Sequence, residues 1–368
     1  MNIPDKKEFE IKEERTRAFM KEQGYDVIVI GTQMNFSWIS CGGDSHVMKG
    51  TDMGEAIIVI TADRKVCILN TMDRRIYVQE LDGLGFELVM LKPTEVSRVE
   101  YAADMIRGMK ALSDFPIEGA KCDAREFYKL HYPLTKSEIT RYRILGKETE
   151  EILWDISNQI KPGMTGSDVE TMIICEYAKK KITVPVLIIG VDDEISSWRH
   201  PIPWAKEIKE CVMIVLAVKR NGLHVPITRM VHFGDVSEDM RKRFNAVCEI
   251  AAFSILSCKE GVKPADLSRW QKEQYKKLGY EEEWEKHFVG GFTGYAVSDA
   301  SLCTDEDAVM TDAMAFNWYV TITGVNTEDT MLISKEGNEL LTVTGLWPTR
   351  EVNTEKGMLK IPDILVIK

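Results

Sequence analysis

Two side chains far apart in the sequence have the chemistry of a general acid or base. His200 lies in the segment Arg-His-Pro-Ile-Pro, and Glu328 lies in the segment Asn-Thr-Glu-Asp-Thr, just before an apolar run. Imidazole exchanges a proton near neutral pH, and the prolines that follow His200 stiffen its loop. A carboxylate such as that of Glu328 can orient water or hold a cationic nitrogen through charge-assisted hydrogen bonds. The alternative is that His200 is only a surface histidine in a turn.

Further polar candidates are two histidines and two arginines. His287 is followed by an apolar, glycine-containing stretch, where an isolated histidine is either catalytic or a satisfied core residue. His224 shares one strand face with Pro226 if that segment is a strand. Arg199 and Arg229 can each bind a substrate carboxylate with two hydrogen bonds, although Arg229 also suits a structural Thr-Arg pair. These four residues are candidates, His287 for catalysis and the other three for substrate binding.

The segment from Cys211 to Gly234 must position several of these residues. It reads as two strands joined by Asn221-Gly222, two residues that tolerate the positive φ angles of a tight hairpin turn. The first strand is apolar from Val212 to Val218, and such a run is typical of a strand inside a sheet. The sequence therefore predicts an antiparallel hairpin in the middle of a sheet.

Two domains are expected, one over residues 1–132 and one over residues 133–368. A chain of 368 residues is long enough to bury two hydrophobic cores. In the first domain, strand patterns alternate with helix patterns, including a helix over residues 94–112, which indicates an α/β unit. In the second domain, a capping box over Ser167 to Glu170 predicts the start of a helix.

Composition excludes several classes of partner. The formal net charge is −11 and the pI is about 5.3, which argues against a nucleic-acid or anionic-membrane partner.

The first residues are charged and lack a signal-peptide core, and no apolar run approaches the ~20 residues needed to span a bilayer. The 8 cysteines contain no Cys-x-x-Cys pair, which argues against a structural zinc site. We expect a cytoplasmic protein.

Several motifs together resemble the family that contains creatinase, aminopeptidase P, prolidase and methionine aminopeptidase. They are the stretches RHPIP, GLHVPITR, HFVGGFTGY, NTEDTMLI and LLTVTGLWP. The resemblance covers nearly the whole chain. It implies a mixed α/β (α+β) protein, with a creatinase-like N-terminal α/β domain followed by a pita-bread catalytic domain in which helices flank an antiparallel sheet.

The metal-dependent members of this family bind two metal ions with a set of Asp, Asp, His, Glu and Glu. The positions of this chain that match the set are Val215, Pro226, His287, Tyr319 and Glu328. One carboxylate and one imidazole cannot neutralise and bridge two divalent ions. We therefore expect a protein without metal and without another cofactor.

Creatinase keeps this fold without metal, and the chain resembles it in retaining His200 and Glu328. The resemblance implies a hydrolase that cuts a C–N bond, an amide or an amidine, in a small polar molecule, with Tyr295 also lining the pocket. Creatinase-like members carry an Arg-Glu pair where this chain has Ser298 and Asp299, so creatine itself is not expected as the substrate.

The family forms homodimers in which a loop of one N-terminal domain lies over the partner's cleft. The matching loop here is GGDSHVMKGTDMG, and we expect His46 to reach a substrate from it. Two alternatives to the creatinase-like hydrolase stay open. One is an Xaa-Pro peptidase with an altered metal site, and the other is a catalytically inactive family member that acts as a binding or scaffold protein.

Overall fold

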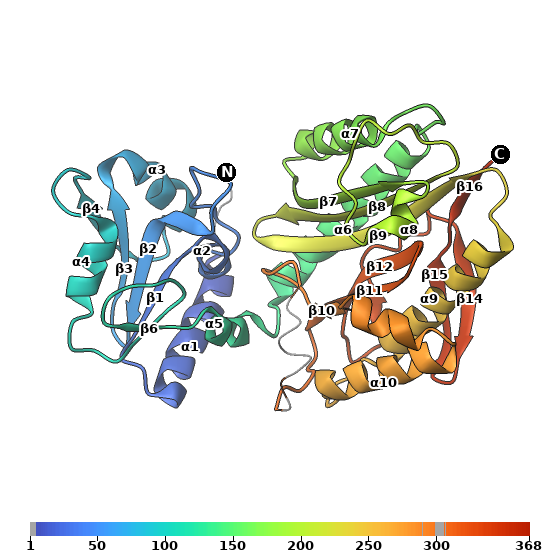
Figure 1. Cartoon of the computed structure of the whole chain (residues 1–368). Coiled ribbons are helices and arrows are strands. Elements are labelled where there is room, and N and C mark those ends of the chain that lie inside the picture. The colour runs from blue at the N-terminus through green and yellow to red at the C-terminus, as the bar shows by residue number, and fades with distance from the viewer. Residues whose placement is uncertain (1–4, 289, 299–304, 306) are drawn as a thin grey trace. The chain divides into compact units, whose positions relative to one another are not determined.

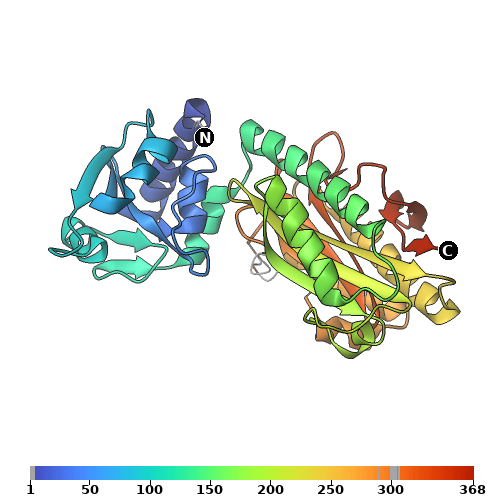
Figure 2. The same cartoon turned by 90° about the horizontal axis from the view of Figure 1, so that it is seen from above.

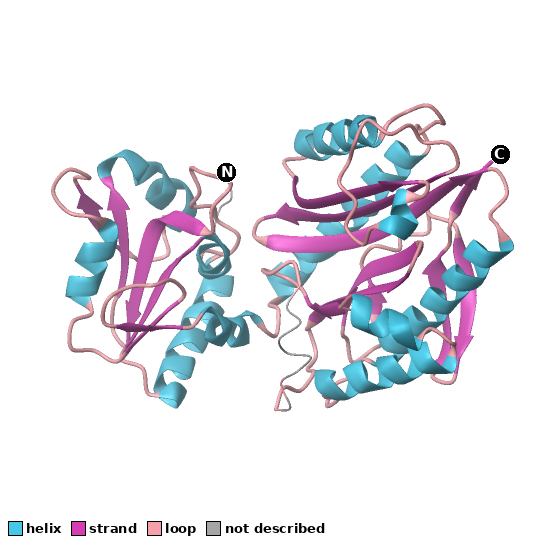
Figure 3. Cartoon of the chain, viewed as in Figure 1, coloured by secondary structure: helices cyan, strands magenta, loops and turns pink. Residues whose placement is uncertain are grey.

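The computed structural model describes residues 5–288, 290–298, 305 and 307–368. The chain folds into two compact units (Figure 1). Unit 1 comprises Met1–Glu138 with Asn221–Leu223, and unit 2 comprises Ile139–Arg220 with His224–Lys368. Each unit combines helices and strands, so the fold is of the mixed α/β class (Figure 3). Within the described residues, no helix is both long and apolar enough to cross a membrane.

Unit 1 is built on a six-stranded mixed sheet in the order β4-β3-β2-β1-β5-β6. Its strands are β1 (Val27–Thr32), β2 (Met53–Thr61), β3 (Lys65–Asn70), β4 (Glu87–Leu91), β5 (Ala111–Ser113) and β6 (Ala120–Cys122). Its helices are α1 (Lys6–Gln23), α2 (Gln33–Ile39), α3 (Arg74–Ile76), α4 (Arg98–Met105) and α5 (Ala124–His131), with the short helical turns η1 (Thr71–Asp73) and η2 (Tyr77–Leu81).

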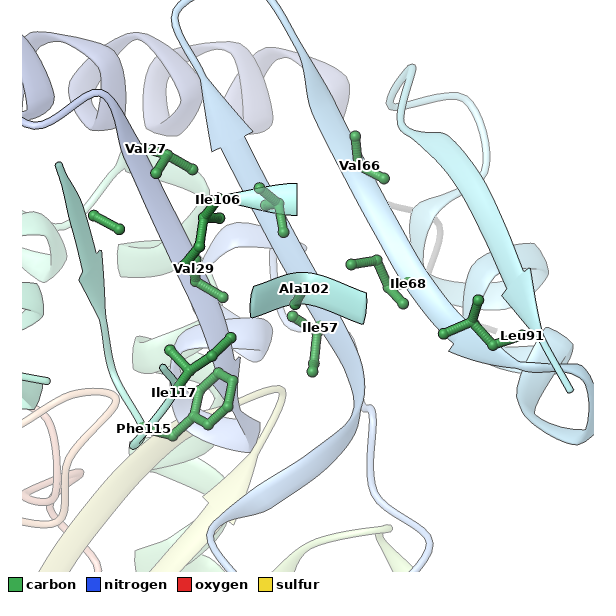
Figure 4. Close-up of a cluster of buried hydrophobic side chains, with 12 residues drawn as sticks. Val27, Val29, Ile57, Val66, Ile68, Leu91, Ala102, Ile106, Phe115 and Ile117 are labelled. Carbon is green, nitrogen blue, oxygen red and sulfur yellow. The ribbon is translucent and has the colours of Figure 1, made fainter. Parts of the chain in front are cut away.

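One face of this sheet forms a hydrophobic core with α4 (Figure 4). Every second residue of the central strands points into it, as with Val27 and Val29 of β1. Ala102 and Ile106 come from α4 and its C-terminal end, and both are fully buried against these strands. Strand side chains two positions apart and helix side chains four positions apart therefore pack together in one core.

The expected helix over residues 94–112 is wrong in its length. Ser97 closes a capping box with Glu100, so α4 begins at Arg98. The helix ends at Met105 with Ile106 as its C-cap, Gly108 then adopts a left-handed φ of 81°, and the chain re-enters the sheet as β5. The expected capping box at Ser167 is also displaced, because Thr165 and Asp168 form the box that opens α7.

Unit 2 is built on an eight-stranded sheet in which β10-β11-β12-β9-β8-β7 follow one another, with β13 beside β12 and β16 beside β9. The strands are β7 (Thr183–Val191), β8 (Cys211–Arg220), β9 (Leu223–Phe233), β10 (Gly290–Phe292), β11 (Ala315–Ile322), β12 (Val325–Leu332), β13 (Glu339–Leu340) and β16 (Leu365–Ile367). A separate hairpin consists of β14 (Thr349–Thr354) and β15 (Gly357–Pro362).

Helices cover the strands of this sheet. They are α6 (Lys136–Ser157), α7 (Gly166–Lys179), α8 (Glu194–Ser197), α9 (Glu238–Ser257) and α10 (Pro264–Lys277), with the short 3-10 helix η3 (Glu281–Lys286). Figures 1 and 2 show α6 and α7, both green, side by side along the sheet. Helix α7 packs against β7, and α9 packs against β11 and β12.

The predicted hairpin is confirmed as β8 and β9, which are neighbours inside the sheet. Asn221 and Gly222 form its turn with φ angles of 51° and 79°. Both central residues have positive φ, as a type I′ turn requires. A local sequence signal thus fixes the register of the two strands that carry Val215 and Pro226.

We predict that Gly222→Ala lowers the free energy of unfolding by about 1 to 2 kcal/mol, because a side chain in the left-handed region costs about that much. Gly50→Ala is the matched control, since Gly50 has no positive φ and a Cβ there meets no atom within 4 Å. Denaturant titration of both variants measures the difference. Equal stability of the two variants would contradict the turn geometry.

Candidate functional site

Unit 2 contains a cavity of about 270 Å³ at strands β7, β8, β9, β11 and β12. Residues after α8 and η3 close its rim. Much of the wall is apolar, including Ile188, Met213 and Val215. The polar side chains on the wall are Arg199, His200, His287, Ser298, Asn317, Tyr319, Thr321, Asn326 and Glu328.

His200 and His287 form a direct contact at this cavity. Their Nε2 atoms are 3.1 Å apart, and their rings meet edge to face with centroids 5.2 Å apart. The Nδ1 atom of His287 faces the carbonyl oxygen of Phe288, which assigns a proton to that nitrogen. In the neutral pair, Nε2 of His287 therefore accepts a hydrogen bond from Nε2 of His200.

The environment of His287 favours its neutral form. Burial lowers its pKa and the charge of Arg199 acts in the same direction, while the contact with the carbonyl oxygen of Phe288 opposes this shift. Its ring also packs edge to face on Tyr319, with centroids 5.2 Å apart. His287 is thus a hydrogen-bonded partner of His200 at a cavity.

The carboxyl group of Glu328 is buried on β12, opposite Thr228 of β9 and Tyr319 of β11. The hydroxyl of Thr228 donates to Oε2 at 2.7 Å, and the amide of Asn317 donates to Oε1 at 3.0 Å. Burial raises the pKa of Glu328 to about 7, against the lowering effect of these two hydrogen bonds. At neutral pH this carboxyl group is therefore divided between its protonated and ionised forms.

Arg199 lines the same cavity, but its charge is already balanced. Its terminal nitrogens donate to Glu283, to Thr321 at 2.8 Å and to Thr323 at 3.2 Å. Burial would raise the pKa of Glu283, but hydrogen bonds from Lys286, Arg199 and Thr323 lower it to about 2. Glu283 stays ionised beside Arg199 throughout the neutral range.

Arg229 does not line the cavity. Strand alternation places it on the opposite face from Thr228, where its guanidinium is buried beside Asp329 with a nitrogen–oxygen distance of 2.8 Å. The guanidinium also donates to the main-chain oxygen atoms of Thr228, Glu328 and Thr342. This geometry is that of the structural Thr-Arg pair, and it places Arg229 away from the described cavity wall, where the expected substrate ligand would lie.

Three other predicted residues also lie away from the described wall of the cavity. His224 is buried near the turn end of β9, its Nδ1 lies 3.1 Å from the carbonyl oxygen of Gly294, and burial lowers its pKa to about 4. Tyr295 is buried. His46 belongs to unit 1, where its ring contacts Asp44. Asp299, which was expected in place of a family glutamate, lies outside the described residues.

The positions that the resemblance matches to metal ligands all line this one cavity. They are Val215, Pro226, His287, Tyr319 and Glu328. Two of them are apolar, and among the residues that the structure describes, no group of three or more His, Cys, Asp or Glu side chains could hold a metal ion. The donor set does not fit a pair of divalent ions.

Sequence reasoning missed the residues that hold Glu328 in place. Asn317, Tyr319 and Thr321 follow one another at every second position of β11, and all three line the cavity. Strand alternation from Tyr319 would have found the other two. Thr228 was noted only as the neighbour of an arginine, because its contact with Glu328 spans 100 positions of sequence.

Comparisons with known proteins agree with this architecture. The model of metallopeptidase family M24 matches residues 140–335. An uncharacterized peptidase of Staphylococcus aureus (strain MW2) is 24% identical over 219 residues, which are 56% of this chain and 62% of the relative. The match thus spans less than two thirds of that relative's length.

Solved structures with the same fold come from several sources. The Xaa-Pro dipeptidase of Bacillus anthracis has a TM-score of 0.75 at 18% identity and covers 98% of this chain and 100% of its own. Dipeptidase PepE of Mycobacterium ulcerans has a TM-score of 0.78 at 14% identity, with 98% of each chain covered. The N-terminal domain of a FACT complex subunit from chickpea has a TM-score of 0.70 at 13% identity and covers 93% of this chain and 98% of its own.

We predict that protein purified without chelator, exposed to Mn²⁺ or Co²⁺ and desalted retains much less than one ion per chain. The reason is that only His287 and Glu328 of the matched positions are common metal ligands. Elemental analysis measures the metal, and EDTA should leave the Tm unchanged. One or two retained ions per chain, lost in His287→Ala and Glu328→Ala, would contradict the prediction.

We predict that Glu328→Gln changes how stability depends on pH. The folded-state pKa of about 7 lies above the ordinary 4.5, so the stability that protonated Glu328 contributes is complete below pH 4.5 and is lost as pH rises through 7. Glutamine cannot ionise, so the variant should gain up to about 3 kcal/mol relative to the parent between pH 5 and 8.

Denaturant titration at each pH measures this difference. Glu351→Gln is the control, since Glu351 is exposed on β14 and carries the same charge. Stability profiles of the parent and Glu328→Gln that stay parallel from pH 5 to 8 would show that the carboxyl group does not titrate there.

Proposed function

The chain belongs to metallopeptidase family M24, and from that membership and its altered site we propose that it hydrolyses a C–N bond, an amide or an amidine, without a metal ion. The observation that carries the proposal is the contact between His200 and His287 in the cavity that Glu328 also lines. His287 and Glu328 lie where the resemblance places metal ligands, His200 contacts His287, and Glu328 is a carboxyl group with a pKa of about 7. The substrate is a small molecule, as the cavity volume of about 270 Å³ supports.

In the proposed reaction, His200 carries the proton. Its Nε2 is held by His287, which leaves Nδ1 to accept a proton from water as the water oxygen bonds to the substrate carbon. The C–N bond then breaks, and His200 returns the proton to the departing nitrogen. Water is the only co-reactant, and no electrons are transferred to or from the protein.

Glu328 anchors the nitrogen side of the substrate in this scheme. Its carboxylate is fixed by Thr228 and Asn317 on neighbouring strands, so it has little freedom to turn away. An N–H group of the substrate that donates to it is oriented before water attacks. His287 is a positioning residue, because it acts on the reaction through His200.

A second candidate function is binding without catalysis. The largely apolar cavity wall supports it. An Xaa-Pro peptidase with an altered metal site is less well supported, because the donor set lacks the carboxylates that two ions need. The homodimer implied by the resemblance stays part of the proposal, and light scattering of the purified protein tests it.

We predict that His200→Ala lowers kcat by a factor of at least about 100 on any amide, amidine or peptide that the parent protein hydrolyses, because a positioned proton carrier contributes that much. His232→Gln is the control, since His232 lies on β9 outside the described cavity wall and should leave the rate unchanged. Initial rates across a substrate panel measure the effect. Equal rates for the parent and His200→Ala, or a parent that binds small molecules and hydrolyses none, would favour the binding function.

A further inference from the structure

We infer that this cavity selects an organic cation, an amidinium or ammonium group on an apolar body, and rejects molecules that carry a carboxylate. The inference rests on the proposed function for the identity of the site, and it adds the charge and polarity of the ligand. It follows from three features of the described cavity wall. Its arginine is paired with a glutamate, two of its amide oxygen atoms accept no hydrogen bond, and apolar side chains stand where the resemblance places carboxylates.

Among its described lysine and arginine residues, the cavity wall has no unbalanced cation to receive a carboxylate. Arg199 is the one lysine or arginine among the described residues of the wall, and Glu283 balances its charge. Arg229 is buried on the other face of the sheet beside Asp329. An anionic ligand would therefore enter a site whose remaining charged group is the acidic Glu328, and this is unfavourable in a partly desolvated cavity.

The wall instead presents hydrogen-bond acceptors. Asn317 is 1% exposed, and its amide nitrogen is used by Glu328, which leaves its buried Oδ1 without a partner in the described structure. The Oδ1 of Asn326, also on the wall, has none either. A buried oxygen atom without a donor costs free energy that a ligand can recover. Asn326 lies two positions from Glu328 on β12 and Asn317 contacts Glu328 directly, so a ligand with several N–H groups can donate to Glu328 and to one of these oxygen atoms.

The body of the ligand meets apolar and aromatic side chains. Val215 and Pro226 stand where the resemblance places carboxylates, and Ile188 and Met213 extend the same wall. At the rim, Trp198 and Phe288 line the cavity while they are 66% and 72% exposed. Aromatic faces attract cations as well as apolar groups, so the rim favours the same class of ligand.

A bound cation would also compensate the negative charge of the buried carboxyl group when this group is ionised. The charged groups that act on Glu328 are Asp329 on the same strand, which opposes ionisation, and Arg229 on the neighbouring strand β9, which favours it. His200 and His287 are the titratable side chains that share its cavity. A bound amidinium would add the compensating positive charge at the side chain itself, through charge-assisted hydrogen bonds.

Isothermal titration calorimetry with three ligands of equal shape tests the inference. Benzamidine carries the cation, benzamide is neutral, and benzoate carries the anion. We expect the parent protein to bind benzamidine at least tenfold more tightly than benzamide, and to show no heat with benzoate. Glu328→Gln should weaken benzamidine binding by a factor of about 10 to 100, as expected when a charged hydrogen-bond partner is lost. The charge-matched control Glu351→Gln should bind like the parent.

Binding of benzoate as tight as that of benzamidine, or no measurable binding of benzamidine, would overturn the inference without any variant. Benzamidine binding that is equal in the parent and in folded Glu328→Gln would also overturn it. Different results would reject the proposed function. Selective, Glu328-dependent binding of benzamidine by a protein that hydrolyses no amide or amidine would uphold the cation site and reject the hydrolase. Hydrolysis that requires His200 but prefers anionic substrates would do the reverse.

Discussion

The chemistry of this cavity depends on a carboxyl group that is buried between neutral donors. Thr228 and Asn317 hold the two oxygen atoms of Glu328 from the strands on either side, at 2.7 and 3.0 Å. Neutral donors compensate the loss of water only in part, so burial still raises the pKa of the group to about 7. A divalent ion in the same place would have held Glu328 ionised. The side chains around Glu328 thus keep its pKa close to neutral pH.

Elsewhere in the site, apolar side chains stand at positions where the resemblance places charged ones. Val215 and Pro226 make the wall apolar on β8 and β9, where the resemblance places two aspartates. His287 keeps its place but contacts His200, so its imidazole belongs to a pair of histidines. In our proposal, the site keeps the positions that the family uses for metal ligands, but its side chains transfer protons in place of binding ions.

Local signals in the sequence predict much of this fold. The Asn221-Gly222 turn follows from residues that tolerate positive φ, and the apolar run before it follows from burial inside a sheet. The end of α4 was not predicted, because the helix-favouring pattern continues beyond Met105, where the backbone leaves the helical conformation at Ile106. Family motifs supplied His200, His287 and Glu328, and the structure brings all three to one cavity.

Contacts between distant segments account for what the sequence did not predict. His200 and His287 lie 87 positions apart on two loops, and no pattern in either loop indicates that their nitrogens meet. Arg229 could not be assigned to one face until the partner of its strand was known. Asn317 was within reach of a period-two argument from Tyr319, but its role follows only from the bond to Glu328.

Adjacent residues on β9 and β12 separate two tasks between the two faces of one sheet. Thr228 and Glu328 face the cavity, while Arg229 and Asp329 form a buried ion pair on the other side, next to Trp347. The ion pair that holds these strands together thus uses other side chains than the cavity face does, although its charges also act on the ionisation of Glu328. Substitutions on the cavity face can therefore alter the polarity of the site while Arg229 and Asp329 go on joining β9 to β12.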